Sequence, residues 1–268
     1  MIDRGKKLVL GVLVSAVDYD ATVSRITTAA KAREPLAVTA LAVHGVMTGV
    51  LDRAQRRRIN GLDMVVPDGQ PVRWALWLLH RETLPDRVYG PKLTGFVCEA
   101  AAAEGLSVYF YGSRQEVVDQ LVQKVHKSYP GIEIAGCEAS KFRRLTPEEN
   151  ECLLARIRAS GADIIFVGLG CPRQETFVFE NSGAVGRPLV AVGAAFDFHA
   201  GMLRQAPNWM QSAGLEWLFR LLVEPRRLWR RYAYLNPLFC ALIVGEMVGI
   251  RRRRDDEDSF ELERMQFG

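Results

Sequence analysis

The sequence predicts an α/β protein built on a Rossmann-like, mostly parallel sheet that is covered by helices. Short apolar, β-branched runs alternate with longer segments of helical periodicity, and parallel strands need such helical crossovers. Several of these runs end in glycine, which suits strand-to-helix turns. With 268 residues, of which 49% are hydrophobic, the chain is long enough to bury a large core.

The strands and helices can be assigned in order along the chain. A helix is expected after Ser113 and another after Thr146, where an N-cap, Pro147 and early acidic residues coincide. The intervening segments carry helical patterns. The expected strands are Leu8–Val14, Leu36–Ala42, Met64–Val66, Ser107–Tyr111, Glu133–Ala135, Asp163–Val167 and Leu189–Val192.

The composition changes near Ala206–Met210, where glycine-rich α/β sequence gives way to aromatic and arginine-rich sequence. This change predicts an α/β domain over residues 1–208 and a helical appendage over 209–250. A charged tail occupies residues 251–268.

The most informative segment is ADIIFVGLGCPRQE, residues 162–175. An apolar run that ends in Gly168, Gly170 and Pro172 predicts a buried strand that opens into a tight turn before a helix. The two glycines let a ligand approach the main chain, and the free N–H groups at a helix start attract anions. We therefore expect a phosphate-bearing ligand at this strand end, with a purely structural turn as the alternative.

Other strand ends carry candidate polar groups. Asp68 follows a short strand and can face the same crevice, although it could instead cap the next helix. Gly112 lies in a further strand-to-helix turn suited to a phosphate or a sugar hydroxyl. Asp197 and His199 could form a metal pair, but two ligands make a weak site, and we expect hydrogen bonds that brace a loop. No metal is expected.

The cysteines and the N-terminal segment bear on the cellular compartment. The five cysteines form no CxxC pair and no metal-ligand spacing with the four histidines, which favours a reducing compartment. The N-terminal apolar run lacks a signal-peptide cleavage pattern, so we expect a first strand there and a cytoplasmic protein.

A net charge of +4 conceals a basic region near the C-terminus. Residues 220–254 hold nine arginines and two glutamates, interleaved with aromatic residues. This pattern predicts binding to an anionic membrane surface. Nucleic acid is the competing partner, but no nucleic-acid-binding motif accompanies the charge, so none is expected. A solvated helix face is the third interpretation.

Tyr232–Ile250 approaches the length of a membrane span. Asn236, Pro237 and Glu246 interrupt it, and arginines flank both of its ends, which gives no clear orientation. We expect this segment to lie on the bilayer rather than cross it.

Seven blocks, taken together and in order, resemble the WecG/TagA/CpsF family of bacterial glycosyltransferases, also called glycosyltransferase family 26. The resemblance covers roughly residues 8–240. The blocks are PDGQPV at 67–72, RVYG at 87–90, YFYGS at 109–113, YPG at 129–131, DIIFVGLGCPRQE at 163–175, VGAAFDFHAG at 192–201, and RQAPNWMQSAGLEWLFRLLVEPRRLWRRY at 204–232.

The resemblance implies an inverting enzyme that moves a sugar from a UDP-sugar to a polyprenyl-diphosphate-linked acceptor, in the synthesis of a cell-surface polysaccharide. It implies a Rossmann-like fold of the GT-E type with a C-terminal appendage. The enzyme would lie peripherally on the cytoplasmic leaflet of the plasma membrane, need no metal or other cofactor, and could form a homo-oligomer.

The resemblance also assigns roles to individual residues. Asp68 corresponds to the proposed general base, which would take the proton of the attacking acceptor hydroxyl. The departing diphosphate then needs arginine charge, because no acidic metal-binding pair is evident. Residues that match the family's appendage arginines are Arg220, Arg227 and Arg230, and those that match its substrate positions are Thr39, Gln174 and Asp197.

The chain departs from the family pattern at three places. The usual asparagine near Thr39 is absent, Lys92 stands where many relatives have an acid, and Ser140-Lys141 replaces a Pro-Pro pair. These changes either alter the donor or acceptor sugar or are surface drift.

Two alternatives come from other functional classes. A nucleotide-cofactor oxidoreductase would use Gly168-Leu-Gly170 as part of a dinucleotide loop, but Arg173 occupies the place of the third glycine. A catalytically silent membrane scaffold would follow if two of these departures, Lys92 and the missing asparagine near Thr39, are disabling.

Overall fold

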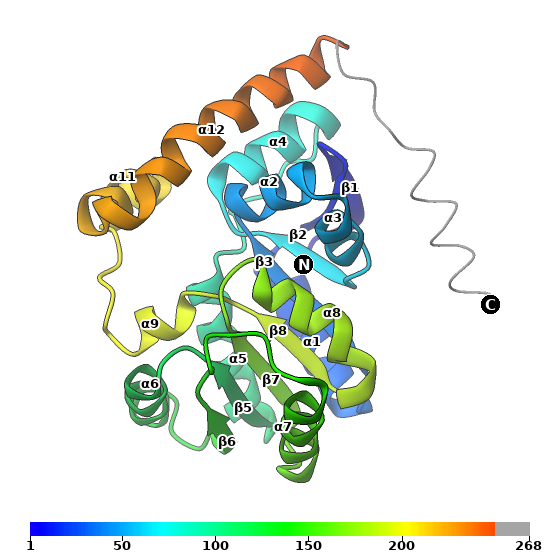
Figure 1. Ribbon diagram of the computed structural model, residues 1–268, viewed down its shortest axis with the longest axis vertical. Coiled ribbons are helices and arrows are strands. Elements are labelled where there is room, and N and C mark those ends of the chain that lie inside the picture. The colour runs from blue at the N-terminus through cyan, green and yellow to red at the C-terminus, as the bar shows by residue number, and fades with distance from the viewer. Residues whose placement is uncertain (250–268) are drawn as a thin grey trace, which may run out of the picture.

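The computed structural model describes residues 1–249, except for the side chains of residues 208, 212, 227, 230 and 231. It confirms the predicted α/β class. Six strands form one all-parallel sheet in the order β4-β3-β8-β7-β5-β6 (Figure 1). These strands are β3 (Leu36–Leu41), β4 (Met64–Pro67), β5 (Ser107–Gly112), β6 (Glu133–Glu138), β7 (Ile164–Gly168) and β8 (Pro188–Ala191).

Helices cover both faces of this sheet. One face shares its core with α2 (Val43–Leu51), α7 (Pro147–Ala159) and α8 (Arg173–Val185). Side chains of α3 (Arg53–Asn60) and α4 (Gln70–His80) belong to the same core. The helices that pack on the other face are α1 (Tyr19–Ala32), α5 (Gly90–Glu104), α6 (Gln115–Ser128) and α9 (Ala195–His199).

The N-terminus differs from the prediction. A single strand over Leu8–Val14 is wrong, because the chain reverses there in an antiparallel hairpin of β1 (Asp3–Val9) and β2 (Val12–Val17). Leu10 and Gly11 form the turn with φ values of 55° and 87°, as a two-residue hairpin turn requires. The hairpin lies beside β4, where the Val65 N–H donates to the Ser15 hydroxyl at 3.0 Å.

The predicted helix starts are close to those observed. Thr146 caps α7 in a capping box with Glu149, as its sequence indicates. Ser113 does not cap α6, because it has a left-handed φ of 54° and Arg114 occupies the N-cap position.

The connections place a crevice at the carboxyl edge of the sheet. β3 and β7 are each followed by a helix on the first face, whereas β8, which lies between them, is followed by α9 on the second face. Neighbouring strands whose crossovers diverge in this way leave a ligand-binding crevice at their carboxyl ends. The sheet therefore opens beside Thr39 of β3 and the residues that follow β8.

Three helices follow α9 and form the region predicted as the appendage. They are α10 (Asn208–Ser212), α11 (Glu216–Val223) and α12 (Pro225–Met247). α12 lies across α2 and α4 (Figure 1), and its Phe239 and Ile243 are buried in the core that α2 and α4 share with the sheet. Among residues 1–249, no helix has both the length and the apolar character that crossing a bilayer demands.

Candidate active site

A cavity of about 120 Å³ lies where the ends of β3 and β4 meet the appendage. Its wall comes from segments far apart in the chain: the starts of α2 and α4, the segment before α5, and helices α11 and α12. The charged and aromatic residues that line it include Asp68, Arg87, Tyr89, Glu216, Trp217, Arg220 and Tyr232.

Asp68 is held at the inner end of this cavity by the backbone. It follows Pro67 at the end of β4, where its N–H donates to the Leu41 carbonyl at 3.2 Å. Its carboxylate Oδ1 accepts the N–H of Gly90, the first residue of α5, at 2.8 Å. Gly69, not Asp68, occupies the N-cap position of α4, and no side chain caps that helix. The alternative that Asp68 caps the next helix is therefore wrong.

Opposing effects set the protonation of Asp68. Asp68 is half-buried, and its removal from water raises its pKa above the ordinary aspartate value. The nearby guanidinium of Arg87, the Gly90 N–H and the charge of Arg220 lower the pKa, while Glu216 adds to the rise. Asp68 is thus a carboxyl group whose affinity for a proton is raised, a property suited to a general base.

Arg87 joins the sheet side of the cavity to the appendage. Its guanidinium forms an ion pair with the Glu216 carboxylate of α11, and both residues are buried. The same guanidinium lies 4.3 Å from the centre of the Tyr89 ring. Two opposite charges removed from water in this way hold α11 against the α/β core.

Arg220 brings a second guanidinium to the cavity from α11. Its charged group lies 3.9 Å from Glu224 and 5.7 Å from the centre of the Phe198 ring. Its Nε is buried and has no hydrogen-bond partner among the described residues. Because a buried donor without a partner is costly, this atom is suited to a ligand that supplies an acceptor.

Thr39, Gln174 and Glu175 form a separate buried cluster in the crevice. The Thr39 hydroxyl and the Gln174 amide both donate to Glu175 Oε1, each at 3.0 Å. Burial raises the pKa of Glu175 above the ordinary glutamate value. The Gln174 Oε1 atom has no hydrogen-bond partner among the described residues, although it lies close to Gly193.

The predicted glycine turns have different surroundings. Gly112 and Gly168 pack against each other at the ends of β5 and β7, where a Cβ on Gly112 would lie 2.5 Å from the Gly168 main chain. Their absent side chains are therefore explained by packing. Gly170 has a φ of 75° and open space where a Cβ would lie, so its main chain remains accessible.

Asp197 and His199 both lie on α9 and are hydrogen-bonded to the neighbouring main chain. His199 Nε2 is hydrogen-bonded to the Pro91 carbonyl at 2.8 Å, so it braces the start of α5 as the loop-bracing interpretation predicts. Asp197 is half-buried on α9, where its main-chain carbonyl accepts N–H groups from Met202 and Leu203. The part of the chain that the structure describes contains no group of three or more potential metal ligands.

Two of the expected arginines cannot be placed in the site. Arg227 and Arg230 belong to α12, but their side chains lie outside the described part of the structure. Two positions that depart from the family pattern lie outside the cavity wall. Lys92 is exposed at the start of α5, and Leu41, two residues after Thr39 where the asparagine is missing, is buried in the core. Neither lines the cavity that contains Asp68.

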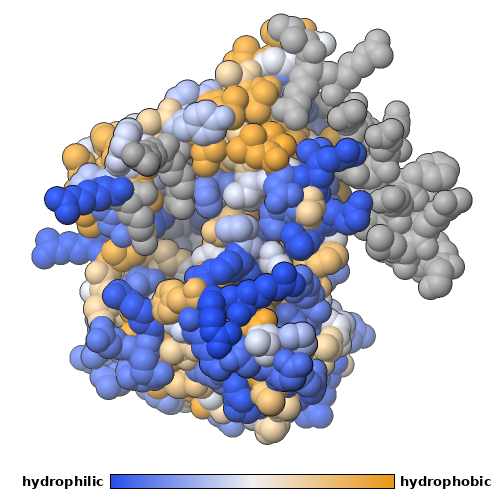
Figure 2. Space-filling model, viewed as in Figure 1, coloured by the Kyte–Doolittle hydropathy of each residue, from blue (hydrophilic) through white to orange (hydrophobic). Residues whose placement is uncertain are grey.

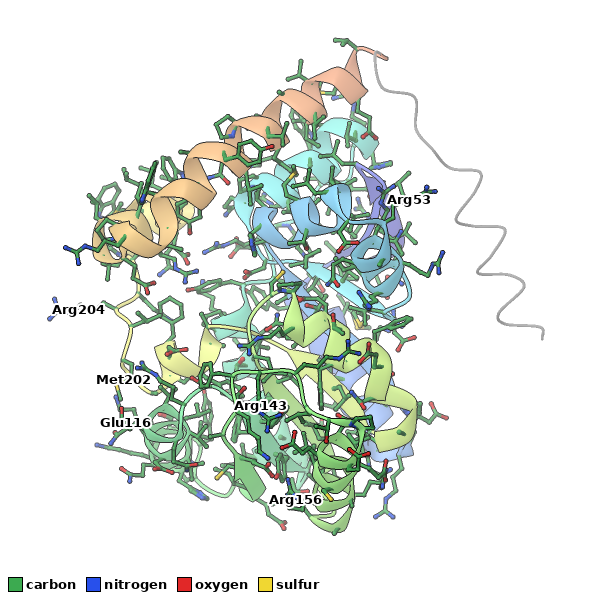
Figure 3. The ribbon with its side chains drawn as sticks, viewed as in Figure 1. Arg53, Glu116, Arg143, Arg156, Met202 and Arg204 are labelled. Atoms are coloured by element: carbon green, nitrogen blue, oxygen red, sulfur yellow. The ribbon has the colours of Figure 1, made fainter. Side chains whose placement is uncertain are left out.

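A second cavity, of about 670 Å³, lies at the ends of β5 and β7 against α7 and α8. Its wall includes Ser140 and four arginines, Arg58, Arg143, Arg144 and Arg173. Figure 3 shows Arg143 and Arg156 on this side of the molecule, away from α12. This cavity shares no lining residue with the first, so it lacks the aspartate and the appendage.

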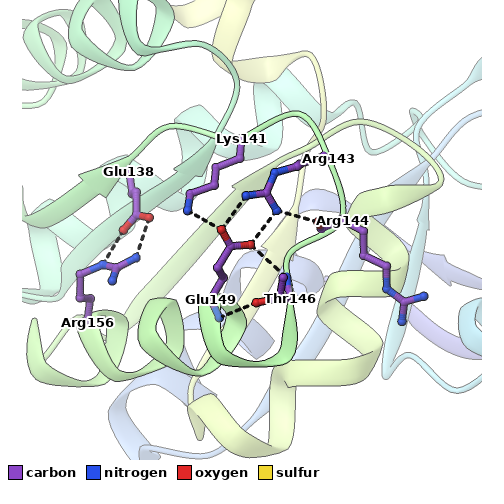
Figure 4. Close-up of polar contacts among 7 residues, drawn as sticks. All are labelled: Glu138, Lys141, Arg143, Arg144, Thr146, Glu149 and Arg156. Atoms are coloured by element: carbon purple, nitrogen blue, oxygen red, sulfur yellow. Dashed lines mark hydrogen bonds and ion pairs between the residues drawn. The ribbon is translucent and has the colours of Figure 1, made fainter.

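The segment at 140–143 is held to α7 by charge (Figure 4). Glu149 accepts hydrogen bonds from Lys141 at 2.9 Å and from Arg143 at 2.6 Å. These cations and the Thr146 N–H lower the pKa of Glu149. Lys141 therefore compensates the charge of a carboxylate on its own side of the molecule.

Sequence reasoning did not assign roles to Arg87, Glu216 or Glu175. Arg87 and Glu175 lie inside the RVYG and PRQE motifs, and membership of these motifs was the signal that could have identified them. Glu216 is an isolated acid in a basic region, and nothing in the sequence pairs it with Arg87. The structure brings Asp68 and Arg220 to one cavity and Thr39 and Gln174 to one cluster.

Comparison with known proteins finds a family model and related proteins that match this chain. The model of the glycosyl transferase WecG/TagA/CpsF family matches residues 7–253. An N-acetylglucosaminyldiphosphoundecaprenol N-acetyl-beta-D-mannosaminyltransferase of Bacillus spizizenii is 32% identical to this chain over 194 residues. That match covers 70% of this chain and 71% of the relative.

Proposed function

Since the chain belongs to the WecG/TagA/CpsF family of glycosyl transferases, we propose that it moves a sugar from a UDP-sugar to a polyprenyl-diphosphate-linked saccharide, with inversion at the anomeric carbon. The product would serve the synthesis of a cell-surface polysaccharide. The observation that carries the proposal is the half-buried Asp68 carboxylate, which lines one cavity with Arg87 and Arg220.

The reaction needs a base on one side of the anomeric carbon. Asp68 takes the proton of an acceptor hydroxyl as the hydroxyl oxygen attacks that carbon, and the bond to the UDP oxygen breaks on the opposite side. Burial supports this role, because it raises the proton affinity of the carboxylate. The hydrogen bond from Gly90 fixes its orientation.

The leaving diphosphate needs positive charge as it departs. Arg220 supplies a guanidinium whose Nε lacks a partner within residues 1–249, and Arg227 and Arg230 are proposed to join it from α12. Planar guanidinium groups match phosphate oxygens, and they stabilise charge in a site that excludes water. The proposal therefore assigns to arginine the role that a metal ion plays in other transferases, and it includes no cofactor.

The donor is proposed to extend from this cavity along the carboxyl edge of the sheet. The cavity of about 120 Å³ is small, so only the reacting end of the donor would lie in it. The main chain of Gly170, which has open space beside it, and the unpartnered amide oxygen of Gln174 are proposed to contact the donor farther along. Thr39, Gly112, Gly168 and Asp197 are proposed to shape or contact the donor there.

The acceptor side of the cavity is apolar and belongs to the appendage. Trp217, Tyr232 and Leu235 line it. The curated relative is named for a substrate that carries N-acetylglucosamine on diphosphoundecaprenol. We propose a lipid-linked acceptor of that class here, reached by an enzyme that lies peripherally on the cytoplasmic leaflet.

The deciding experiment measures turnover. Purified full-length protein is incubated with a panel of UDP-sugars and polyprenyl-diphosphate-linked N-acetylglucosamine, and the release of UDP is followed with a chelator present. We expect release with one donor and a product of inverted anomeric configuration by NMR. No release from any pair supports the silent scaffold, and a thermal shift with NAD but not UDP supports the oxidoreductase.

A further inference from the structure

All five tryptophans of the chain are exposed, and all five lie on four helices at one end of the molecule. The exposed fraction ranges from 41% to 64%. None belongs to the sheet or to the helices that cover its opposite end. They are Trp74 and Trp77 of α4, Trp209 of α10, Trp217 of α11 and Trp229 of α12.

Such a distribution is unusual for a water-soluble surface. A tryptophan ring has a large apolar area, and its N–H gives it one polar edge. Tryptophan is therefore enriched where a protein meets the headgroup region of a bilayer. The surface of the four helices that carry the five rings therefore suits a membrane interface as its partner.

Two of these tryptophans lie outside the appendage. Trp74 and Trp77 are three residues apart on α4, which follows β4 directly and belongs to the α/β part of the chain. Packing joins Trp74 to the appendage, because a Cβ on Gly214 would lie 2.9 Å from the Trp74 ring. α4 also packs against α12 along its length (Figure 1).

This surface continues to the mouth of the active-site cavity. Gly69, Gln70 and Pro71, at the start of α4, line the cavity together with Gly214 and Trp217. Trp74 lies one turn farther along α4 from that wall, and Trp77 lies almost one turn beyond it. A bilayer that met these rings would lie at the opening through which an acceptor reaches Asp68.

Exposed cations accompany the rings. The guanidinium of Arg81 lies 5.8 Å from the centre of the Trp77 ring, and Arg226 is exposed at the start of α12. Arg204, which precedes α10, points away from the body of the molecule (Figure 3). Aromatic rings beside arginines suit a surface that carries anionic phosphate headgroups.

Aliphatic side chains extend the apolar character of this end of the molecule. Figure 2 shows hydrophobic residues gathered over the end formed by α12 and α2, whereas the opposite half is largely hydrophilic. Exposed members include Leu51, Leu222, Val223, Val244 and Val248.

We propose that Trp74 and Trp77 of α4 insert, together with the appendage, into the interface of an anionic phospholipid bilayer. α4 then sets the tilt of the enzyme, so that the cavity mouth faces the lipid. The orientation rests on the proposed lipid-linked acceptor, but contact between α4 and the bilayer can be measured without any turnover.

Single-tryptophan variants of the full chain test the contact directly. In each variant, four of the five tryptophans are replaced by phenylalanine. One variant keeps only Trp77, and the other keeps only Trp229. Each is mixed with phosphatidylglycerol-containing vesicles whose acyl chains carry bromine, a short-range quencher. We expect a blue shift and quenching in both variants, and quenching of Trp229 alone would overturn the role of α4.

A second variant pair measures the contribution to binding. Trp77→Ser should weaken sedimentation with anionic vesicles about tenfold, because a large apolar group no longer leaves water. Phe179→Ser is the matched control, since Phe179 is 39% exposed on α8 but lies outside this surface. Equal binding of the two variants, or light scattering that shows a dimer held together through Trp77, would also overturn the proposal.

Activity separates this proposal from the proposed function. With a short-chain, water-soluble acceptor, Trp77→Ser should turn over like wild type, while turnover of an acceptor embedded in vesicles should fall severalfold. If Trp77 is quenched but no acceptor reacts, the proposed transferase reaction fails and the membrane contact stands. If both acceptors react equally well with Trp77→Ser, the orientation by α4 is wrong.

Discussion

The guanidinium of Arg87 and the carboxylate of Glu216 form a buried ion pair across 129 residues of sequence. Arg87 lies in the segment just before α5 and Glu216 begins α11, so the pair fixes how the appendage closes the cavity around Asp68. The burial has an energetic consequence, because each charge relies on the other in place of water. The pair thus makes the stability of the appendage and the shape of the candidate active site depend on one another.

Glu216→Ala should destabilise the fold by about 3–5 kcal/mol, because Arg87 would remain charged and buried without its partner. Urea unfolding measures the difference. Arg87→Ala should cost a similar amount, and the double variant should lose much less than the sum of the two. Additive losses would show that the two charges do not stabilise each other.

Asp68→Asn should keep UDP affinity and lower kcat by about 10²–10⁴-fold, because an amide cannot take the proton of the acceptor. Asp163→Asn is a matched control. Its carboxylate also accepts a main-chain N–H, that of Ser107 at 2.9 Å, but it lies at the opposite end of the strands. Initial rates with saturating substrates measure kcat, and equal rates for the two variants would remove Asp68 from the role of base.

Asp68 should also make stability depend on pH. Burial raises its pKa in the folded protein, whereas the unfolded chain has the ordinary value of about 3.9. As pH rises between these two values, the unfolded chain loses a proton that the folded protein keeps. Wild type should therefore lose stability relative to Asp68→Asn from about pH 4 up to the raised pKa. A difference in unfolding free energy that does not vary with pH would contradict this expectation.

Arg220→Gln should lower kcat by about 10²–10³-fold, because the leaving diphosphate loses a guanidinium. Arg220→Lys should restore part of the rate, since it keeps the charge but not the planar fork. Arg33→Gln, an exposed change at the end of α1, away from the cavity, is the control for net charge. If Arg220→Gln raised only the KM of the donor and left kcat unchanged, Arg220 would bind the donor equally well before and during the reaction, and it would not stabilise the departing diphosphate.

The parallel sheet could be predicted because buried parallel strands leave continuous apolar runs. The hairpin at Leu10 could not, since leucine rarely adopts a left-handed φ and only Gly11 signalled a turn. Asp68 was identified because its strand end and its family motif agree. The pairing of Arg87 with Glu216 depends on tertiary packing across the whole chain, for which no local pattern exists.

Glu175 offers a test of whether the buried cluster works with a neutral acid. Glu175 Oε1 accepts hydrogen bonds from both Thr39 and Gln174, and burial raises the pKa of the carboxyl group. Glu175→Gln retains an oxygen that can accept both bonds. If Glu175 is neutral, this variant should have unchanged stability and a rate within about threefold of wild type.

Glu175→Leu should lower the unfolding free energy by about 1–3 kcal/mol for each donor that it leaves without an acceptor. It should also raise the donor KM, since Gln174 would no longer be oriented. Thermal unfolding and donor titrations measure the two effects. A large loss of rate in Glu175→Gln would mean that an ionised Glu175 is required.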